Sequence, residues 1–273
     1  MPNGPALSPS GPELDQQLRS LTTGPARGAV FCDIDGTLAL IVERPNEARV
    51  PAGVSGLLKS LTASYACVAC VSGRPALEAR RLVGVGAIAY AGLHGAELLL
   101  PGQHQPSLAP SLEGWRSAVQ GFTAVHSRWA EALGARVEDK GPVAAFHWRG
   151  VADEEAALRH LRSVADAANE AGLSARWGRK VLEVWPPVNI GKGQAVGALV
   201  RASRARVALY GGDDATDLDA FDALDTLVAK GDLDAAVRVG VRSEEAPGDI
   251  VTRADIVVEG VEGFKHVLKR LLA

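Results

Sequence analysis

This chain of 273 residues has few aromatic residues, few cysteines and a small net charge. Phe, Trp and Tyr make up 5% of the sequence, and the formal net charge is −3 with no basic block. Proteins that bind a phosphate backbone usually carry a basic stripe, so we expect no nucleic acid as a partner. No apolar run approaches the roughly 18 residues that a membrane span requires, and we therefore expect no membrane association.

The cysteine count is three, which is low and odd. It argues against a disulfide framework and fits the reducing cytoplasm, so we expect a cytoplasmic protein, and we expect a monomer. Cys67 and Cys70 match the C-x-x-C pattern of redox and zinc sites. They lie in the strand-like run YACVACV, where residues i and i+3 point to opposite faces. We therefore interpret both as buried small hydrophobic side chains.

The first 27 residues are rich in proline and glycine and lack the apolar core of a secretory signal. We expect residues 1–27 to form a flexible N-terminal segment, with one short helix at 13–21.

Two stretches of the chain alternate strands with helices, which predicts a parallel sheet with right-handed crossovers. Between them, helices combined with two hairpins predict an α+β unit with an antiparallel sheet. The sequence thus predicts one α/β core, residues 28–103 and 188–273, interrupted by an inserted module at 104–187. The strands expected in the core are 28–34, 65–71, 87–91, 205–210, 226–229, 236–239 and 255–258, and its helices are 51–63, 75–83, 192–201, 217–224 and 261–272. The insertion has helices at 110–133 and 153–171 and hairpins at 136–140 with 143–149 and at 173–177 with 181–185.

The run FCDIDGTLAL, residues 31–40, places Asp33 and Asp35 where the first strand ends. Positions i and i+2 of a strand share a face, so the two carboxylates are expected side by side. Their repulsion requires a cation or a proton between them. A turn alone would need one aspartate before Gly36, not two.

A second acidic cluster follows the strand-like run ARVALY, in GGDDATDLDAF at 211–221. One or two acidic residues are ordinary in a first helical turn, but this segment carries four aspartates, 213, 214, 217 and 219. Carboxylate oxygens suit Mg²⁺. Two such clusters at the ends of strands of one parallel sheet predict a shared metal site.

Two further residues fit a phosphate at the same edge. Ser72 follows the second strand and offers a hydroxyl, and Lys192 begins a helix, where free N–H groups favour anions. Each signal is weak alone, and GKG is not a P-loop, which requires G-x-x-x-x-G-K-[ST].

Together these segments resemble the four-motif set of the haloacid dehalogenase-type phosphatases, and more closely its trehalose-6-phosphate phosphatase branch. The resemblance runs from about residue 28 to the C-terminus. It rests on DIDGT at 33–37, VSGRP at 71–75, GLHGAE at 92–97, VLEVWP at 181–186, GKGQAV at 191–196 and GDDATDLDAF at 212–221. It implies a parallel-sheet, Rossmann-like core with an inserted α+β cap domain.

The resemblance also implies roles. Asp33 would be the nucleophile that forms an aspartyl-phosphate, and Asp35 would protonate the leaving sugar oxygen and then activate water. The cofactor would be Mg²⁺, with Ser72 and Lys192 completing the catalytic set and Arg74 and Gly36 contacting the substrate. The metal ligands would come from Asp33, Asp35, Asp213, Asp214 and Asp217, with the choice between the last two open.

The cap domain would read the sugar through Glu138, Lys140 and Glu183. The alternative, exposed strand residues without a ligand, stays open. His94 is expected to be structural, and His147 is assigned to neither role. The function implied is hydrolysis of trehalose 6-phosphate. A sucrose-phosphate or mannosyl-phosphoglycerate type of substrate, and a non-catalytic sugar-phosphate-binding module, remain the alternatives, although the presence of both Asp33 and Asp35 counts against the module.

Overall fold

The computed structural model describes residues 11–42, 47–178, 180–188, 190–243 and 247–273. The chain divides into two compact units, residues 1–107 with 190–273 and residues 108–189, which we call the core unit and the inserted unit. The sequence predicts this insertion at 104–187. No helix among the described residues is long and apolar enough to cross a bilayer.

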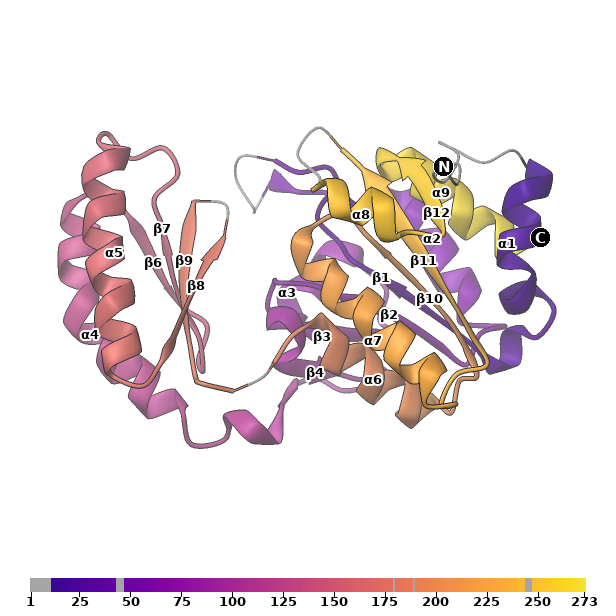
Figure 1. Ribbon diagram of the computed structural model, residues 1–273, viewed down its shortest axis with the longest axis horizontal. Helices are drawn as coiled ribbons and strands as arrows, with labels where there is room; N and C mark the ends of the chain where they lie inside the picture. The colour runs from indigo at the N-terminus through magenta and orange to yellow at the C-terminus, as the bar shows by residue number, and fades with distance from the viewer. Residues whose placement is uncertain (1–10, 43–46, 179, 189, 244–246) are drawn as a thin grey trace. The chain divides into compact units, whose positions relative to one another are not determined.

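The core unit is built on an eight-stranded sheet in the order β12-β11-β10-β1-β2-β3-β4-β5 (Figure 1). The strands from β12 to β3 are parallel, and β4 pairs antiparallel with β3. The bounds are β1 Gly28–Cys32, β2 Cys67–Val71, β3 Ala89–Gly92, β4 Glu97–Leu99, β5 Ser107–Leu108, β10 Val207–Gly212, β11 Ala235–Arg242 and β12 Ile256–Glu259.

Helices cover both faces of this sheet (Figure 1). On one face, Val30 and Cys32 of β1 belong to an apolar cluster with α1, α2, α3 and α9. On the other, Ala29 and Phe31 belong to a cluster with α6, α7 and α8. All five residues of β1 are buried, as expected for a central parallel strand. The helices are α1 Gly11–Thr22, α2 Ala52–Leu61, α3 Ala76–Val83, α6 Lys192–Ser203, α7 Leu218–Ala229, α8 Gly248–Arg253 and α9 Gly260–Arg270.

The two cysteines of the C-x-x-C pattern point to opposite faces of β2. Cys70 lies in the cluster with α3, and Cys67 packs against the cluster with α6. Burial raises the pKa of Cys67 to about 11 and raises that of Cys70 as well. The interpretation as a buried apolar side chain is confirmed for Cys70, whereas Cys67 is only partly buried.

The N-terminal segment departs from the prediction. Residues 11–27 form α1 and the short helix η1 Pro25–Arg27. Leu14, Leu18 and Leu21 recur at helical spacing and are buried in the apolar cluster of the core unit. In addition, Nε of Arg270, on α9, donates a hydrogen bond to Asp15 of α1 at 2.7 Å. The expected short helix at 13–21 is present, but the flexibility predicted for this part is wrong because a leucine stripe anchors it. Residues 1–10 lie outside the described part.

A second correction concerns residues 226–229, predicted as a strand. They are the last turn of α7. Leu224 and Leu227 continue the buried face of that helix from Phe221, so helical periodicity outweighs the β-branched residues of the segment. The sequence also fails to predict β4, β5 and α8, which are all short.

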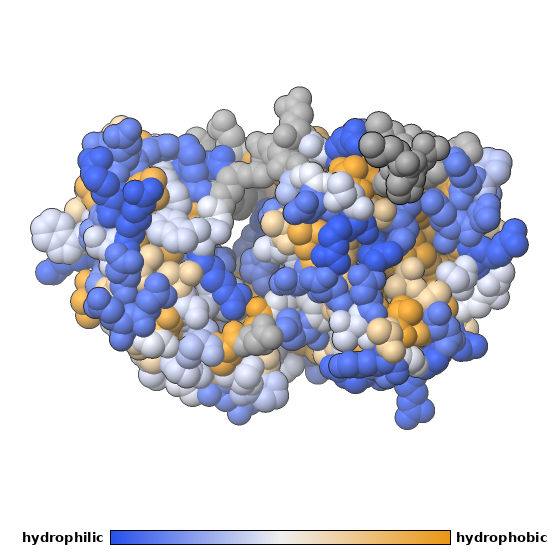
Figure 2. All heavy atoms as spheres, viewed as in Figure 1, coloured by the Kyte–Doolittle hydropathy of each residue, from blue (hydrophilic) through white to orange (hydrophobic). Residues whose placement is uncertain are grey.

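The inserted unit has a four-stranded antiparallel sheet in the order β6-β7-β9-β8. Side chains of one sheet face, such as Phe146, Leu182 and Val184, form an apolar cluster with its two long helices. In the view of Figure 2, hydrophilic side chains cover much of the exposed side of α5, and likewise of α7 in the core unit. The elements are η4 Pro110–Leu112, α4 Arg116–Ala132, β6 Arg136–Asp139, β7 Ala144–His147, α5 Glu154–Glu170, β8 Ser174–Gly178 and β9 Val181–Trp185.

Candidate active site

Three neighbouring strands of the core unit end in the polar residues that the sequence singles out. Asp33 follows β1, Ser72 follows β2 and Asp213 follows β10. Because the three strands are parallel and adjacent, these residues stand at one edge of the sheet, where parallel sheets bind ligands. The backbone N–H of Asp33 still donates to Gly211 at 2.8 Å, so the strand pairing holds the nucleophile candidate in place.

Lys192 joins Asp33 to the second acidic cluster. Its Nζ lies 2.7 Å from Oδ1 of Asp33 and 2.7 Å from Oδ1 of Asp217. The exposed fractions of these residues are 3%, 4% and 0%. A buried ammonium between two buried carboxylates is stable only because each charge has its partner.

Asp217 is occupied by donors on both oxygens. Oδ1 accepts from Lys192 and from the Tyr210 hydroxyl at 2.6 Å. Oδ2 accepts from the backbone N–H groups of Asp213 and Asp214 at 3.0 and 2.9 Å. These bonds fix the turn after β10 and the position of the Lys192 ammonium. Asp217 therefore has a structural role in the cluster.

Burial shifts the pKa values of three groups in the cluster, Asp33, Asp213 and Lys192. It raises the pKa of Asp33 well above its usual range, although Lys192 opposes the shift. It also raises the pKa of Asp213 to about 7, with the negative charge of Asp217 adding to the effect. For Lys192 burial acts in the opposite direction, but Asp217 and Asp33 outweigh it and raise the pKa. The two carboxyls therefore carry their charge at a cost that an additional cation would offset.

The donor set fits a hard cation. Carboxylate oxygens of Asp33, Asp213 and Asp217 lie within 4.8 Å of one another. Asp217 is filled by four donors, whereas Asp213 accepts one long bond, 3.3 Å, from the Thr37 hydroxyl. Among the described residues, no hydrogen bond reaches Oδ2 of Asp33. Asp33 and Asp213 thus have oxygens available for Mg²⁺, which favours such ligands.

Asp35 and Asp214 lie outside this group of carboxylates. The tight turn of residues 34–39 begins before Asp35, with Leu38 and Ala39 both donating to the carbonyl of Ile34. The strand alternation that would align Asp33 with Asp35 therefore does not extend to Asp35. Asp214 is instead the N-cap of the short helix η5 Ala215–Asp217, where its carboxylate accepts from the N–H of Ala215 at 2.6 Å.

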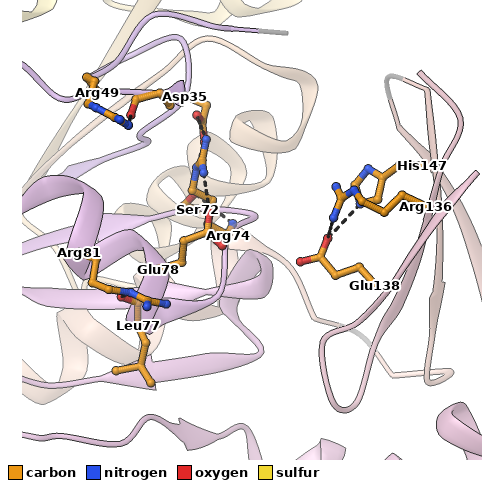
Figure 3. Close-up of polar contacts among 11 residues, drawn as sticks. Asp35, Arg49, Ser72, Arg74, Leu77, Glu78, Arg81, Arg136, Glu138 and His147 are labelled. Atoms are coloured by element: carbon orange, nitrogen blue, oxygen red, sulfur yellow. Dashed lines mark hydrogen bonds and ion pairs between the residues drawn. The ribbon is translucent and has the colours of Figure 1, made fainter. Parts of the chain in front are cut away.

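Arg74 binds Asp35 with both arms of its guanidinium. Nε donates to Oδ2 and Nη2 to Oδ1, each at 2.7 Å, while Nη1 donates to Glu78 at 2.5 Å (Figure 3). The Arg74 side chain is 11% exposed. The residue predicted to contact substrate is thus the partner of the residue predicted to move the proton.

Gly36 is required by the close approach of two turns. Its φ is +92°, and a Cβ at this position would overlap the carboxylate of Asp213. Any other residue would displace that metal-ligand candidate.

Hydrogen bonds join the segments VSGRP and GLHGAE to one another. Ser72 N donates to Ala91, His94 N to Ser72 and Leu93 N to Arg74, each at 2.9 Å, and Ala76 N donates to the Glu97 carboxylate at 2.8 Å. Leu93 and His94 have φ of 49° and 53°, a strained conformation for such residues. The His94 ring packs so closely on Gly73 that a Cβ there would lie 2.7 Å from Nε2. These contacts support the structural role expected for His94.

In the inserted unit, the predicted sugar-reading residues share the polar face of the sheet. Glu138 and Glu183 both pair in register with Ala145, and Arg176 pairs with Glu183, so one row crosses all four strands. Lys140 follows Glu138 by two residues and reaches Glu183 with Nζ–Oε1 at 2.9 Å. The opposite face packs on α4 and α5.

Further side chains orient these carboxylates. Trp185 Nε1 donates to Oε2 of Glu183 at 3.0 Å, and the Arg176 guanidinium stacks on the Trp185 ring at 4.5 Å. Nε2 of His147 lies 3.0 Å from Oε2 of Glu138 (Figure 3). That hydrogen bond lowers the pKa of Glu138 to about 2, because it outweighs partial burial. Glu138 is therefore an acceptor over the whole physiological pH range.

The family model described as trehalose-phosphatase matches residues 31–252, most of the chain and every motif described above. The chain belongs to the trehalose-phosphatase family. The family predicted from the motifs is thus confirmed.

Two curated relatives bear out this membership. An uncharacterized glycosyl hydrolase of Mycobacterium tuberculosis is 38% identical over 233 residues, covering 79% of this chain and 17% of that protein. A trehalose-phosphate phosphatase of Mycobacterium marinum is 35% identical over 210 residues, covering 72% of this chain and 52% of that protein. The chain thus spans about half or less of the length of these two relatives.

Solved structures agree on the fold. A trehalose-6-phosphate phosphatase related protein superposes with a TM-score of 0.68 at 26% identity, covering 88% of this chain and 95% of that one. A haloacid dehalogenase-like hydrolase from Bacteroides thetaiotaomicron superposes with a TM-score of 0.61 at 11% identity, covering 89% and 98%. The predicted fold class, an α/β core of the haloacid dehalogenase type with an inserted α+β module, is confirmed.

Several residues that complete the trehalose-phosphatase motifs here are not found from the sequence. Tyr210 and Thr37 bind Asp217 and Asp213, and Glu78 binds Arg74. Thr37 lies inside the quoted DIDGT motif and Tyr210 lies two residues before GDDATDLDAF, so their positions are a signal that could have found these contacts. Trp185 stands inside the quoted VLEVWP, but nothing in the sequence indicates its bond to Glu183, since that bond depends on neighbouring positions along one sheet face.

Proposed function

We propose that this protein is a Mg²⁺-dependent phosphatase that hydrolyses trehalose 6-phosphate to trehalose and phosphate through an aspartyl-phosphate on Asp33. The observation that carries the proposal is the buried cluster of Asp33, Lys192, Asp217 and Asp213 at the edge of the parallel sheet. The name of the Mycobacterium marinum relative supports the substrate.

Asp33 is the group that attacks phosphorus. Its backbone is fixed by pairing with β10, and Lys192 holds Oδ1 while Oδ2 accepts no hydrogen bond from the described residues. Attack by a carboxylate divides a difficult hydrolysis into two easier steps. Lys192 also carries the positive charge that a phosphoryl group needs beside its oxygens. Ser72, whose hydroxyl accepts from the N–H of Arg74 at 3.2 Å, lies at the end of the adjacent strand and is the other phosphate contact we propose.

Mg²⁺ would be held by Asp33 and Asp213, and it would supply positive charge that reduces the repulsion between carboxylate and phosphate. Asp35 handles the proton, which goes to the leaving sugar oxygen in the first step and comes from water in the second. In the inserted unit, Glu138, Lys140 and Glu183 bind sugar hydroxyls, because charged groups on one sheet face form strong hydrogen bonds with them. A cytoplasmic monomer remains a prediction of the sequence.

The test is phosphate release from a panel of sugar phosphates, with Mg²⁺ and with excess EDTA. We expect trehalose 6-phosphate to be turned over faster than sucrose 6-phosphate, mannosyl-phosphoglycerate and glucose 6-phosphate, and EDTA to abolish release from all of them. Rapid turnover of another sugar phosphate with trehalose 6-phosphate inert would refute the substrate but not the chemistry. Full activity in EDTA would refute the metal requirement.

A further inference from the structure

We propose that Arg74 is a positioning residue that fixes the Asp35 carboxylate for proton transfer, and that it does not bind the sugar phosphate. This inference rests on the proposed function, because it assigns Arg74 a role through Asp35. It replaces the direct substrate contact that the sequence predicts for Arg74.

The geometry of the pair carries the proposal. Nε and Nη2 of one planar guanidinium donate to the two oxygens of one carboxylate, both at 2.7 Å. Such a fork fixes the plane of the carboxylate as well as its distance, which a single point charge cannot do. Asp35 follows β1 within a tight turn, where strand pairing no longer orients its side chain. The guanidinium therefore supplies the orientation that the backbone pairing gives to Asp33.

Arg74 is itself held on several sides. Its third guanidinium nitrogen donates to Glu78 on the first turn of α3, its backbone N–H donates to Ser72 Oγ, and its carbonyl accepts from Leu93. To reach a phosphate, the side chain would have to break ion pairs with two carboxylates. The arrangement instead transmits the rigidity of the clamped VSGRP and GLHGAE segments to Asp35.

The two aspartates of the first motif thus have separate cations. Lys192 serves Asp33, which must attack, and Arg74 serves Asp35, which must exchange a proton. The Arg74 fork leaves each Asp35 oxygen with further lone-pair capacity, so holding the carboxylate does not exclude a second hydrogen bond to water or to the leaving oxygen.

The first measurement compares Arg74→Ala and Arg74→Lys with wild type on the sugar phosphate that wild type hydrolyses best. For Arg74→Ala we expect kcat to fall about 10- to 100-fold with KM changed by less than about threefold, because a loosened catalytic group costs rate and not affinity. Arg74→Lys should fall between, since it keeps the charge but loses the fork. A KM raised tenfold or more with kcat unchanged would overturn the proposal and restore the substrate contact.

The second measurement is a double-mutant cycle with Asp35→Asn. If Arg74 acts through Asp35, then Arg74→Ala combined with Asp35→Asn should match Asp35→Asn alone within about twofold. A further loss as large as that of Arg74→Ala in the wild-type background would overturn the proposal. If Asp35→Asn itself keeps full activity, the proposed role of Asp35 fails instead, and the two failures are distinguishable.

Arg81→Ala is the matched control. Arg81 lies on the same helix as Glu78, is exposed, and donates only to the carbonyl of Leu77 among the described residues (Figure 3). We expect its kcat and KM to equal those of wild type. Unfolding midpoints of all variants, measured by circular dichroism, separate a loss of rate from a loss of folded protein.

Discussion

The core unit gathers its charged groups at an edge of a sheet, whereas the inserted unit spreads its charged groups over a face. In the core, parallel strands end together, and the turns after them converge on a buried cluster around Lys192. In the inserted unit, antiparallel strands alternate, so that Glu138 and Glu183 point to one side and apolar neighbours to the other. An edge concentrates charge at a point, and a face distributes hydrogen-bonding groups over an area.

The difference extends to how far each group depends on its neighbours. Lys192 and Asp217 are almost completely buried, and removing one charge leaves the others without compensation. Glu138 and His147 keep 29% and 24% of their side chains exposed, so water can replace a lost partner. Under the proposed function, the rigid edge suits the chemistry on phosphate, and the more exposed face suits recognition of the sugar.

Asp33→Asn should have the largest effect on activity, and it tests the edge. The substitution removes the proposed nucleophile, so we expect turnover to fall about 10³-fold or more for every phosphate ester, including p-nitrophenyl phosphate. The measurement is kcat for trehalose 6-phosphate and for p-nitrophenyl phosphate, together with the unfolding midpoint of each protein. As a control, Asp225→Asn removes an exposed partner of Arg238 on α7, beyond the motif that ends at residue 221, and should leave kcat unchanged. Near-normal turnover in folded Asp33→Asn would refute covalent catalysis.

The edge is also the part of the molecule that the sequence predicts best. Asp33, Ser72, Lys192 and Asp213 each follow or begin a regular element, and the meeting of parallel strand ends brings such residues together. That Asp35 pairs with Arg74, and not with the cluster around Asp33, is not predictable in this way. It depends on where β1 ends and how the turn at 34–39 folds. The failure at residues 226–229 has a similar origin, since a short β-branched run reads as a strand until the buried face of α7 is known.

On the face, the alternation of strand residues is predictable but their partners are not. The hairpins place Glu138 and Lys140 on one side from sequence alone, two residues apart. That Lys140 bonds to Glu183, and Glu183 to Trp185, requires the strand order β6-β7-β9-β8, which no local pattern contains. Propensity and periodicity fix elements, whereas register and strand order fix pairs.

Glu183→Ala should have the next largest effect, and it tests the face. We expect kcat/KM for trehalose 6-phosphate to fall about 10- to 100-fold relative to that for p-nitrophenyl phosphate, because the small ester makes no sugar contacts. The measurement is the ratio of the two kcat/KM values in wild type and variant. Glu183→Gln is the matched variant, since its amide oxygen can still accept from Trp185 while the charge facing Lys140 is lost. An unchanged ratio in Glu183→Ala would mean that Glu183 has a structural role only.

The smallest expected effect concerns the stability of the inserted unit in acid. The pKa of Glu138 is lowered to about 2 from an ordinary value of 4.5, mainly by the hydrogen bond from His147. Between these values the unfolded chain binds more protons than the folded one, so stability rises with pH. The contribution of Glu138 is fully present above its ordinary pKa and is lost as the pH falls through about 2. Because the side chain is 29% exposed, we expect about 1–2 kcal/mol of this contribution to disappear between pH 6 and pH 3.

The five tryptophans of the chain, all within residues 108–189, make this measurement specific to the inserted unit. Urea unfolding followed by tryptophan fluorescence should show wild type more stable than Glu138→Gln at pH 6, with the difference shrinking toward pH 3. Gln keeps the shape and the acceptor oxygen facing His147 and removes only the charge, so other carboxyls that titrate in this range affect both proteins equally and cancel in the difference. If the difference in free energy of unfolding between the two proteins stays constant from pH 6 to pH 3, the Glu138–His147 contact contributes no charge-dependent stability. The charged groups on this face would then depend on their partners even less than their exposure indicates.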